Sequence, residues 1–219
     1  MRIQALHGEY RTAFVLLLGV MFLGTLPTAR GETSASATEW RLEKREDGIE
    51  VHTRPVPGSG IRAFKGETII ETDLESVLAV IRDAEHYQDW FPNCPESRLL
   101  RREESVVHQY NVTAAPWPID DRDNIFRSAL ERDPETGAAE ISIEAAPGFH
   151  PEQPGRVRVQ SAEGRWRLEP RGEDSTWVLF ELHLEPGGGI PDWLANARIV
   201  STPFEALTNL RRMTSRSES

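Results

Sequence analysis

Apolar and polar side chains alternate along most of residues 40–185, which is the pattern of β-strands with one buried face. The clearest run is Trp177 to Glu185, where one face carries Val178, Phe180, Leu182 and Leu184. Further strands are predicted over 106–114, 122–130, 141–145 and 157–168, the last with a break near Glu163 and Gly164. Sequential strands joined by short turns indicate an antiparallel sheet.

The start of this region predicts a hairpin and a short helix. Strands at 40–45 and 49–54 flank Asp47-Gly48, a pair typical of a tight two-residue turn, and a third strand follows at 61–70. Thr72-Asp73-Leu74-Glu75 then reads as a capping box that opens a helix. Its apolar residues recur at helical spacing: Leu74, Val77, Leu78 and Ile81.

The period changes again after the glycines at 187–189. Apolar residues recur every three or four positions, which predicts a long helix over 191–213: Trp193, Ala197, Val200, Phe204 and Leu207. Pro203 removes a backbone hydrogen bond there, so we expect a kink or a split, with Thr202 and Glu205 capping the second half. The predicted fold class is α+β, a curved antiparallel sheet that grips a C-terminal helix.

The first 31 residues have the pattern of an export signal, because a short apolar run at 13–26 follows Arg2 and Arg11 and precedes small residues near Gly31. The alternative is an uncleaved membrane anchor. We therefore expect a signal peptide at 1–31, a spacer at 32–39, one domain at 40–214 and a tail at 215–219. The predicted location is outside the cytoplasm, in the periplasm.

Charge and cysteine content narrow the functional classes. The formal net charge is −10, which disfavours binding to nucleic acid and gives no general attraction to anionic membranes. Cys94 is the only cysteine, so no internal disulfide can form, and a thiol without a histidine tied to it in sequence reads as a chance residue rather than a nucleophile. We expect a monomer without a cofactor.

The stretch APWPIDDRDN at 115–124 can be read as a metal site or as the corner of a fold. Asp120, Asp121 and Asn124 mimic the spacing of an aspartate-rich magnesium site, but Pro118 and the alternation that follows favour a turn and a strand. On a strand the acids cannot converge on one ion, so we favour the corner. We expect Arg122 to bond a nearby carboxylate, and Arg122 or Asn124 to contact a ligand.

Other catalytic or metal patterns are weak. The sequence contains no Gly-x-Ser-x-Gly elbow, zinc spacing or phosphate loop. Glu181, His183 and Glu185 share a strand face and could hold a metal, but a solvated face is the simpler interpretation. We therefore predict no catalytic residue and no metal ligand.

The sequence resembles the START family, the steroidogenic-acute-regulatory-related lipid-transfer domains, and especially its exported bacterial members. The similarity runs from about residue 40 to 213. The motifs of this chain that support the resemblance are Gly48-Ile49-Glu50-Val51, Phe64-Lys65-Gly66, Pro116-Trp117-Pro118 with Arg122-Asp123, Trp166, Pro186-Gly187-Gly188 and Ile190-Pro191-Asp192-Trp193. The resemblance implies a helix-grip fold and non-covalent binding and transfer of one lipid-like molecule in an internal tunnel.

One position departs from the sterol-transfer members of that family. Where they carry a tunnel arginine paired with an acid, this chain has Ser128, and we expect Tyr110 on the facing strand. Neutral hydroxyls therefore replace the ion pair, and no sterol can be named as the ligand.

Three functions stay open. The first is a lipid carrier, in which inward-facing residues of different sizes leave a cavity between sheet and helix. The second is an enzyme of the helix-grip class, such as a cyclase or hydrolase. The third is a regulatory module whose core is solid. We favour the carrier, with transient membrane contact and motion at 90–94 and around Pro203. The expected ligand contacts are Trp90, Tyr110, Val112, Trp117, Arg122, Asn124, Phe126, Ser128, Ile141, Ile143, Phe180, Leu182, Trp193, Ala197, Val200, Phe204 and Leu207.

Overall fold

The computed structural model describes residues 39–215, so the predicted export signal lies outside the described residues. The strands are β1 (Arg41–Glu46), β2 (Ile49–Arg54), β3 (Ala63–Ile70), β4 (Ser97–Arg102), β5 (Val106–Thr113), β6 (Asp121–Arg132), β7 (Ala139–Ala145), β8 (Arg156–Arg158), β9 (Ser161–Pro170) and β10 (Thr176–Glu185). The helices are α1 (Leu74–Arg82), α2 (Asp192–Asn196) and α3 (Ser201–Thr214), with short 3-10 turns η1 (Tyr87–Asp89) and η2 (Pro147–Phe149). None of the described helices is long and apolar enough to cross a membrane.

Nine of the strands follow the order β1-β2-β3-β10-β9-β7-β6-β5-β4, and every pair along this path is antiparallel. β8 pairs with β6 in parallel, off the main path. The predicted break near Glu163 and Gly164 is wrong, because the break lies between β8 and β9. Gly164 continues β9 opposite Leu182, and a Cβ on it would lie 2.3 Å from the backbone oxygen of Glu181. The glycine permits close strand approach there.

The first hairpin and the first helix match the predicted positions. Asp47 and Gly48 have positive φ angles of 50° and 72°, as a tight turn between β1 and β2 requires. The cap of α1 differs from the expected capping box, because Asp73 rather than Thr72 accepts the backbone N–H of Ser76, at 3.0 Å. The hydroxyl of Thr72 instead donates to the backbone oxygen of Glu71.

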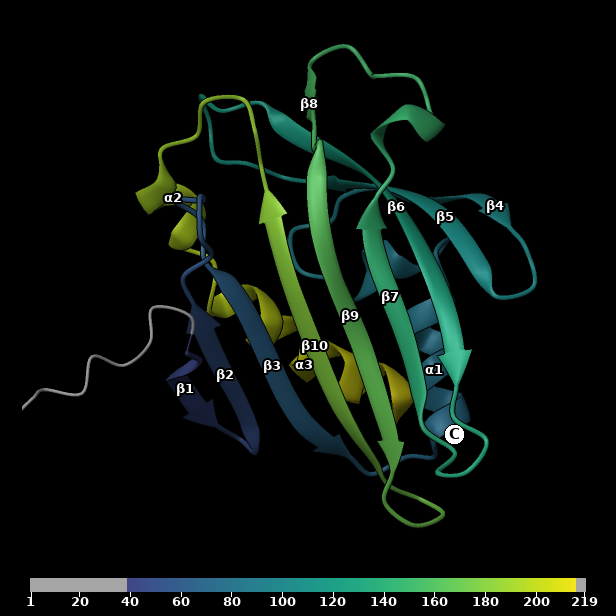
Figure 1. The fold of residues 1–219 in the computed structure, drawn as a ribbon. Coiled ribbons are helices and arrows are strands. Elements are labelled where there is room, and N and C mark those ends of the chain that lie inside the picture. Colours follow the sequence, from purple (N-terminus) through teal and green to yellow (C-terminus); the bar gives the residue numbers. More distant parts are fainter. Residues whose placement is uncertain (1–38, 216–219) are drawn as a thin grey trace, which may run out of the picture. The chain divides into compact units, whose positions relative to one another are not determined.

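Helices α1 and α3 lie against one face of the curved sheet, called here the inner face (Figure 1). α3 packs on β2, β3 and α1, and α1 also contacts β9. Gly66 of β3 allows the close approach of α3, since a Cβ at this position would lie 2.9 Å from Leu207 Cδ1 and 3.1 Å from Pro203 Cβ. This arrangement confirms the predicted α+β helix-grip fold.

The C-terminal helix is split, but not by Pro203. α2 ends at Asn196, and α3 begins at Ser201. Pro203 falls in the first turn of α3, where a backbone N–H would have no partner within the helix, so proline is tolerated. The predicted capping by Thr202 and Glu205 is wrong, because α3 has no side-chain cap.

β4 was not predicted from the pattern. Its sequence SRLLRR does not alternate, and it is an edge strand with three arginines. Charged residues are typical of sheet edges because they hinder pairing with another chain.

Candidate functional site

A cavity of about 400 Å³ lies between the inner face of the sheet, the end of α1 and the segment that carries α2 into α3. Its walls come from β5, β6, β7, β9 and β10, and from loops around residues 91–93, 114–119 and 186–202. Large apolar rings form part of the wall, including Trp166 and Phe180, whose rings stack at 4.0 Å between centroids. The side chains therefore leave a space between the sheet and the helical segment.

About half of the predicted contact residues line this cavity. They share the inward phase of their strands or lie beside α2: Arg122, Asn124, Phe126, Ser128, Ile141, Ile143, Phe180, Leu182 and Ala197. The alternation predicted for residues 122–130 is thus found in β6. Their role in ligand binding stays a prediction.

Tyr110 and Val112 are misplaced in the prediction, because β5 has the opposite phase. Its lining residues are Val107, Gln109, Asn111 and Thr113. Tyr110 and Val112 are fully buried on the other face, in a small cluster with Ile125. The residue opposite Ser128 is consequently Val107 and not Tyr110.

Three tryptophans also lie away from the cavity wall. Trp117 is 93% exposed and Trp193 is 73% exposed, although their neighbours Pro116 and Leu194 line the cavity. Trp90 is buried in the core, where its ring packs against those of Tyr87, Phe91 and Trp166.

Three predicted ligand contacts pack α3 against the rest of the protein instead of lining the cavity: Val200, just before the helix, and Phe204 and Leu207 within it. Leu207 is fully buried in the hydrophobic core, against which Val200 and Phe204 pack. The ammonium of Lys44 lies 3.4 Å from the ring centroid of Phe204. The helical period places these side chains correctly on the buried face, but that face meets the sheet and not the cavity.

β5 and β6 form a polar end of the cavity, of which the sequence predicted Arg122 and Asn124 but not Asn111 and Thr113. Asn111 pairs with Asn124, and Thr113 pairs with Arg122, so the four side chains form a square patch on the inner face. Asn124 Nδ2 donates to Asn111 Oδ1 at 2.8 Å and to Thr113 Oγ1 at 3.0 Å. Asn111 could have been found from the alternation of β5, where it shares a face with Gln109 and Thr113. That face is the more polar one, so it was not expected to point inward.

Arg122 is buried in this patch and bonds carbonyl groups instead of the expected carboxylate. Its guanidinium donates to the backbone oxygens of Asp120, Pro186 and Gly187, the last at 3.0 Å. Burial lowers the pKa of Arg122, against the opposing effect of the nearby carboxylates Asp120 and Asp121. The side chain thereby ties the start of β6 to the glycine turn after β10.

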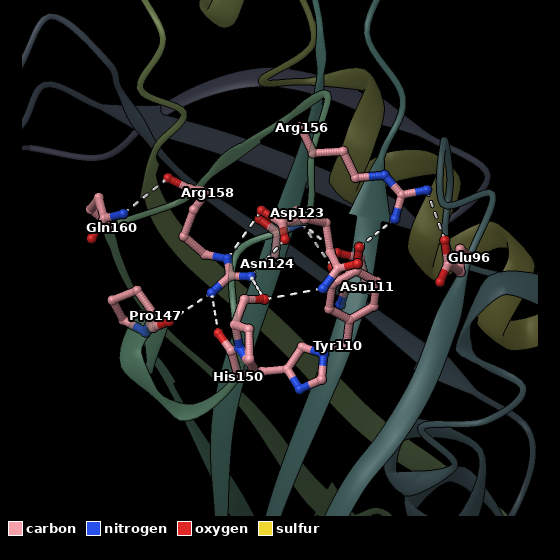
Figure 2. A network of polar contacts seen from close by, with 12 residues as sticks. Glu96, Tyr110, Asn111, Asp123, Asn124, Pro147, His150, Arg156, Arg158 and Gln160 are labelled. Atoms are coloured by element: carbon pink, nitrogen blue, oxygen red, sulfur yellow. Dashed lines mark hydrogen bonds and ion pairs between the residues drawn. The ribbon is translucent and has the colours of Figure 1, made fainter.

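The acids of the 120–124 stretch do not converge on one point. Asp121 accepts the backbone N–H of Ala115 at 2.9 Å. Asp123 lies on the other face of β6 and binds Arg158 through both carboxylate oxygens, at 3.0 and 2.7 Å (Figure 2). The stretch is therefore a corner of the fold, as favoured from the sequence.

The cavity wall offers little for acid–base chemistry. Among the described residues, its lining contains no aspartate, glutamate, histidine or cysteine. Tyr87 lines it, but burial raises the pKa of its hydroxyl well above the ordinary value, so it stays protonated. Cys94 lies outside the lining, and burial raises the pKa of its thiol to about 11.

Potential metal ligands meet elsewhere among the described residues. Glu50, His52 and Glu67 bring one ligand atom each to within 4.8 Å of one another, away from the cavity. Lys65 already lies 3.2 Å from Glu67 and neutralises part of this charge. The Glu181–His183–Glu185 face holds ion pairs of Glu181 with Arg54 and Arg165 instead.

Comparisons with known proteins agree on one family. The family model described as "Polyketide cyclase / dehydrase and lipid transport" matches residues 70–211. An uncharacterised protein of Pseudomonas aeruginosa is 35% identical over 178 residues, covering 81% of this chain and 88% of the relative. Rat phosphatidylcholine transfer protein is 25% identical over 167 residues, covering 74% of this chain and 77% of the relative.

A solved structure gives the same result. The crystal structure of a STAR-related lipid transfer protein from Xanthomonas axonopodis has 37% sequence identity and a TM-score of 0.76, covering 80% of this chain and 98% of that one. The chain therefore belongs to the START-like family of polyketide cyclases, dehydrases and lipid transport proteins, as its sequence motifs predicted.

Proposed function

We propose that this protein binds a single hydrophobic molecule of lipid type non-covalently in the cavity and transfers it through an aqueous compartment. The observation that carries the proposal is the cavity of about 400 Å³ with walls that include Phe126, Ile143 and Phe180. This volume falls within the range of about 300–1,000 Å³ of sites that hold small ligands. Relatives named as lipid transfer proteins support the same function.

Burial of apolar surface would drive the binding. Each methylene removed from water contributes about 0.8 kcal/mol, so a chain of about sixteen carbons would gain on the order of 10 kcal/mol before the costs of association. The lining supports binding over catalysis, because none of the described side chains that line the cavity provides a carboxylate or an imidazole for proton transfer.

Ligand exchange requires an opening in the wall. We propose that two lining segments move, residues 90–94 and the stretch that links α2 to α3. Both lie between elements of regular structure, and both contribute lining residues, such as Phe91 and Ile199. Export, a monomeric state and transient membrane contact fit such a carrier and stay predictions from the sequence.

A pair of matched substitutions tests the proposal. Ile143→Trp would fill the cavity from β7, whereas Ile69→Trp would add the same bulk at a position that is 48% exposed. Binding of the fluorescent probes butylpyrene and pyrenebutanol is measured by titration. We expect Ile143→Trp to weaken binding by at least about tenfold and Ile69→Trp to leave it unchanged. Failure of the native chain to bind either probe would contradict the proposal.

A further inference from the structure

The two asparagines at the polar end of the cavity carry hydrogen-bonding atoms without a partner. Asn111 is 4% exposed and Asn124 is 1% exposed, and both line the cavity. The buried atoms Asn111 Nδ2 and Asn124 Oδ1 have no hydrogen-bond partner in the part of the chain that the structure describes. Buried polar groups are nearly always paired, so this adjacent open donor and open acceptor need an explanation.

The orientation of the two amides is fixed by their neighbours. Asn124 Nδ2 donates to Asn111 Oδ1, to Thr113 Oγ1 and, at 3.3 Å, to the backbone oxygen of Asn111. Rotating the Asn124 amide would direct its oxygen at that carbonyl, which also accepts only. The pair consequently leaves one N–H and one C=O unpaired at the cavity wall.

We infer that Asn111 and Asn124 bind a neutral hydroxyl at the head of the apolar ligand. A hydroxyl accepts one hydrogen bond and donates one, so it satisfies Asn111 Nδ2 and Asn124 Oδ1 together. This inference rests on the proposed function, since it names the head group of the molecule that the cavity holds.

A carboxylate head fits the same place less well. It can only accept hydrogen bonds, so it would leave Asn124 Oδ1 unpartnered and would bring two negative oxygens towards that atom. Three described arginines line the cavity, Arg82, Arg122 and Arg198. Arg122 lies two residues before Asn124 on the same face of β6, and three of its N–H groups already bond backbone carbonyls. The two amides therefore select a neutral donor–acceptor group over an anion.

Three probes with the same apolar body test the inference in the intact protein. They are pyrenebutanol, butylpyrene and pyrenebutyrate, which end in a hydroxyl, a methyl group and a carboxylate. We expect the native chain to bind pyrenebutanol at least about tenfold more tightly than either of the others, because the methyl group and the carboxylate leave buried polar atoms unpaired.

Two variants locate the head group. The double substitution Asn111→Leu with Asn124→Leu replaces both amides by apolar side chains of similar size, and we expect it to bind pyrenebutanol and butylpyrene equally. Ser142→Ala is the control, because Ser142 lies in β7 outside the cavity lining, and it should keep the full preference. A preference that survives in the double variant, or that is lost in Ser142→Ala, would overturn the assignment.

The outcomes separate this inference from the function on which it rests. If the native chain binds pyrenebutanol and butylpyrene equally, or binds pyrenebutyrate most tightly, the hydroxyl site is wrong while the hydrophobic carrier stands. If it binds none of the probes, the carrier itself is contradicted. The comparison of probes on the native chain decides the question even if the double variant does not fold.

Discussion

The ion pair between Asp123 and Arg158 lies behind the polar end of the cavity, on the outer face of β6. Both side chains are almost completely buried, with 0% and 2% exposure. Arg158 also donates to the backbone oxygens of Pro147 and His150 (Figure 2). It donates to the backbone oxygen of Pro151 as well. One guanidinium thereby holds β6 and the η2 segment together through a bidentate pair and three carbonyl bonds.

Removing one charge of this pair should be costly. Asp123→Asn leaves a buried guanidinium without its counter-ion, so we expect the free energy of unfolding to fall by about 3–5 kcal/mol. Glu75→Gln is the control, because it breaks the exposed pair with Arg132 and should cost about 1 kcal/mol or less. Urea unfolding measures both, and equal losses would contradict the account.

Cys94 should be nearly inert in the folded chain. Its thiol is buried and donates to the backbone oxygen of Glu96, and its pKa is raised to about 11. Because the thiolate is the nucleophile, alkylation by iodoacetamide should rise about tenfold per pH unit between about pH 8 and 10. At about pH 8 it should be at least about a hundredfold slower than in urea-unfolded protein. Equal rates in both states would show that the thiol is accessible.

The packing of helix α3 depends on a close contact with β3 at Gly66. A methyl group there would press on Pro203, whose ring cannot rotate away, and on the fully buried Leu207. We expect Gly66→Ala to lower the free energy of unfolding by about 1–3 kcal/mol. Gly148 has open space around it, so Gly148→Ala should change stability by about 0.5 kcal/mol or less. Thermal unfolding distinguishes the two, and an unaffected Gly66→Ala would refute the close packing.

The side chain of Asn196 ties the short helix α2 to the loop before β3. Asn196 accepts the backbone N–H of Arg62 at 3.0 Å and donates to the backbone oxygen of Gly60 at 2.9 Å. If the segment that links α2 to α3 opens for ligand exchange, these two bonds help to keep it closed.

Hydrogen exchange tests this contact. Asn196→Ala removes both bonds, so amides at 190–199 should exchange about tenfold faster while the central strands are unchanged. Asn209→Ala is the matched control, because Asn209 donates to the backbone oxygen of Trp90 and its loss should affect the 90–94 segment instead. Protection at 190–199 equal to that of the strands in both variants would argue against a moving segment.

For the whole molecule, sequence pattern predicted the elements better than the cavity wall. β10 and α1 each have a continuous apolar face, so their period identified both. β5 is buried on both sides, because its outer face is covered near Tyr110 by β8 and the η2 segment. Tyr110 and Val112 lie on its outer face, whereas the polar residues Gln109, Asn111 and Thr113 line the cavity, which reverses the rule used to orient this strand.

The prediction that Trp117 and Trp193 contact the ligand was wrong about their position for a related reason. Trp117 and Trp193 are exposed, although large aromatic side chains are usually well buried. Hydrophobicity alone could not place them outside the cavity, and only the paths of the 114–120 loop and of α2 do so. The register of β5 against β6, which brings Asn111 beside Asn124, is likewise a property of the folded sheet.

Native mass spectrometry of the protein purified from cells that naturally produce it is the decisive experiment for lipid binding. We expect a complex heavier than the chain by the mass of one hydrophobic molecule, and the loss of that complex in Ile143→Trp but not in Ile69→Trp. A chain that carries no such molecule, and from which organic solvent extracts none, would contradict the proposed function.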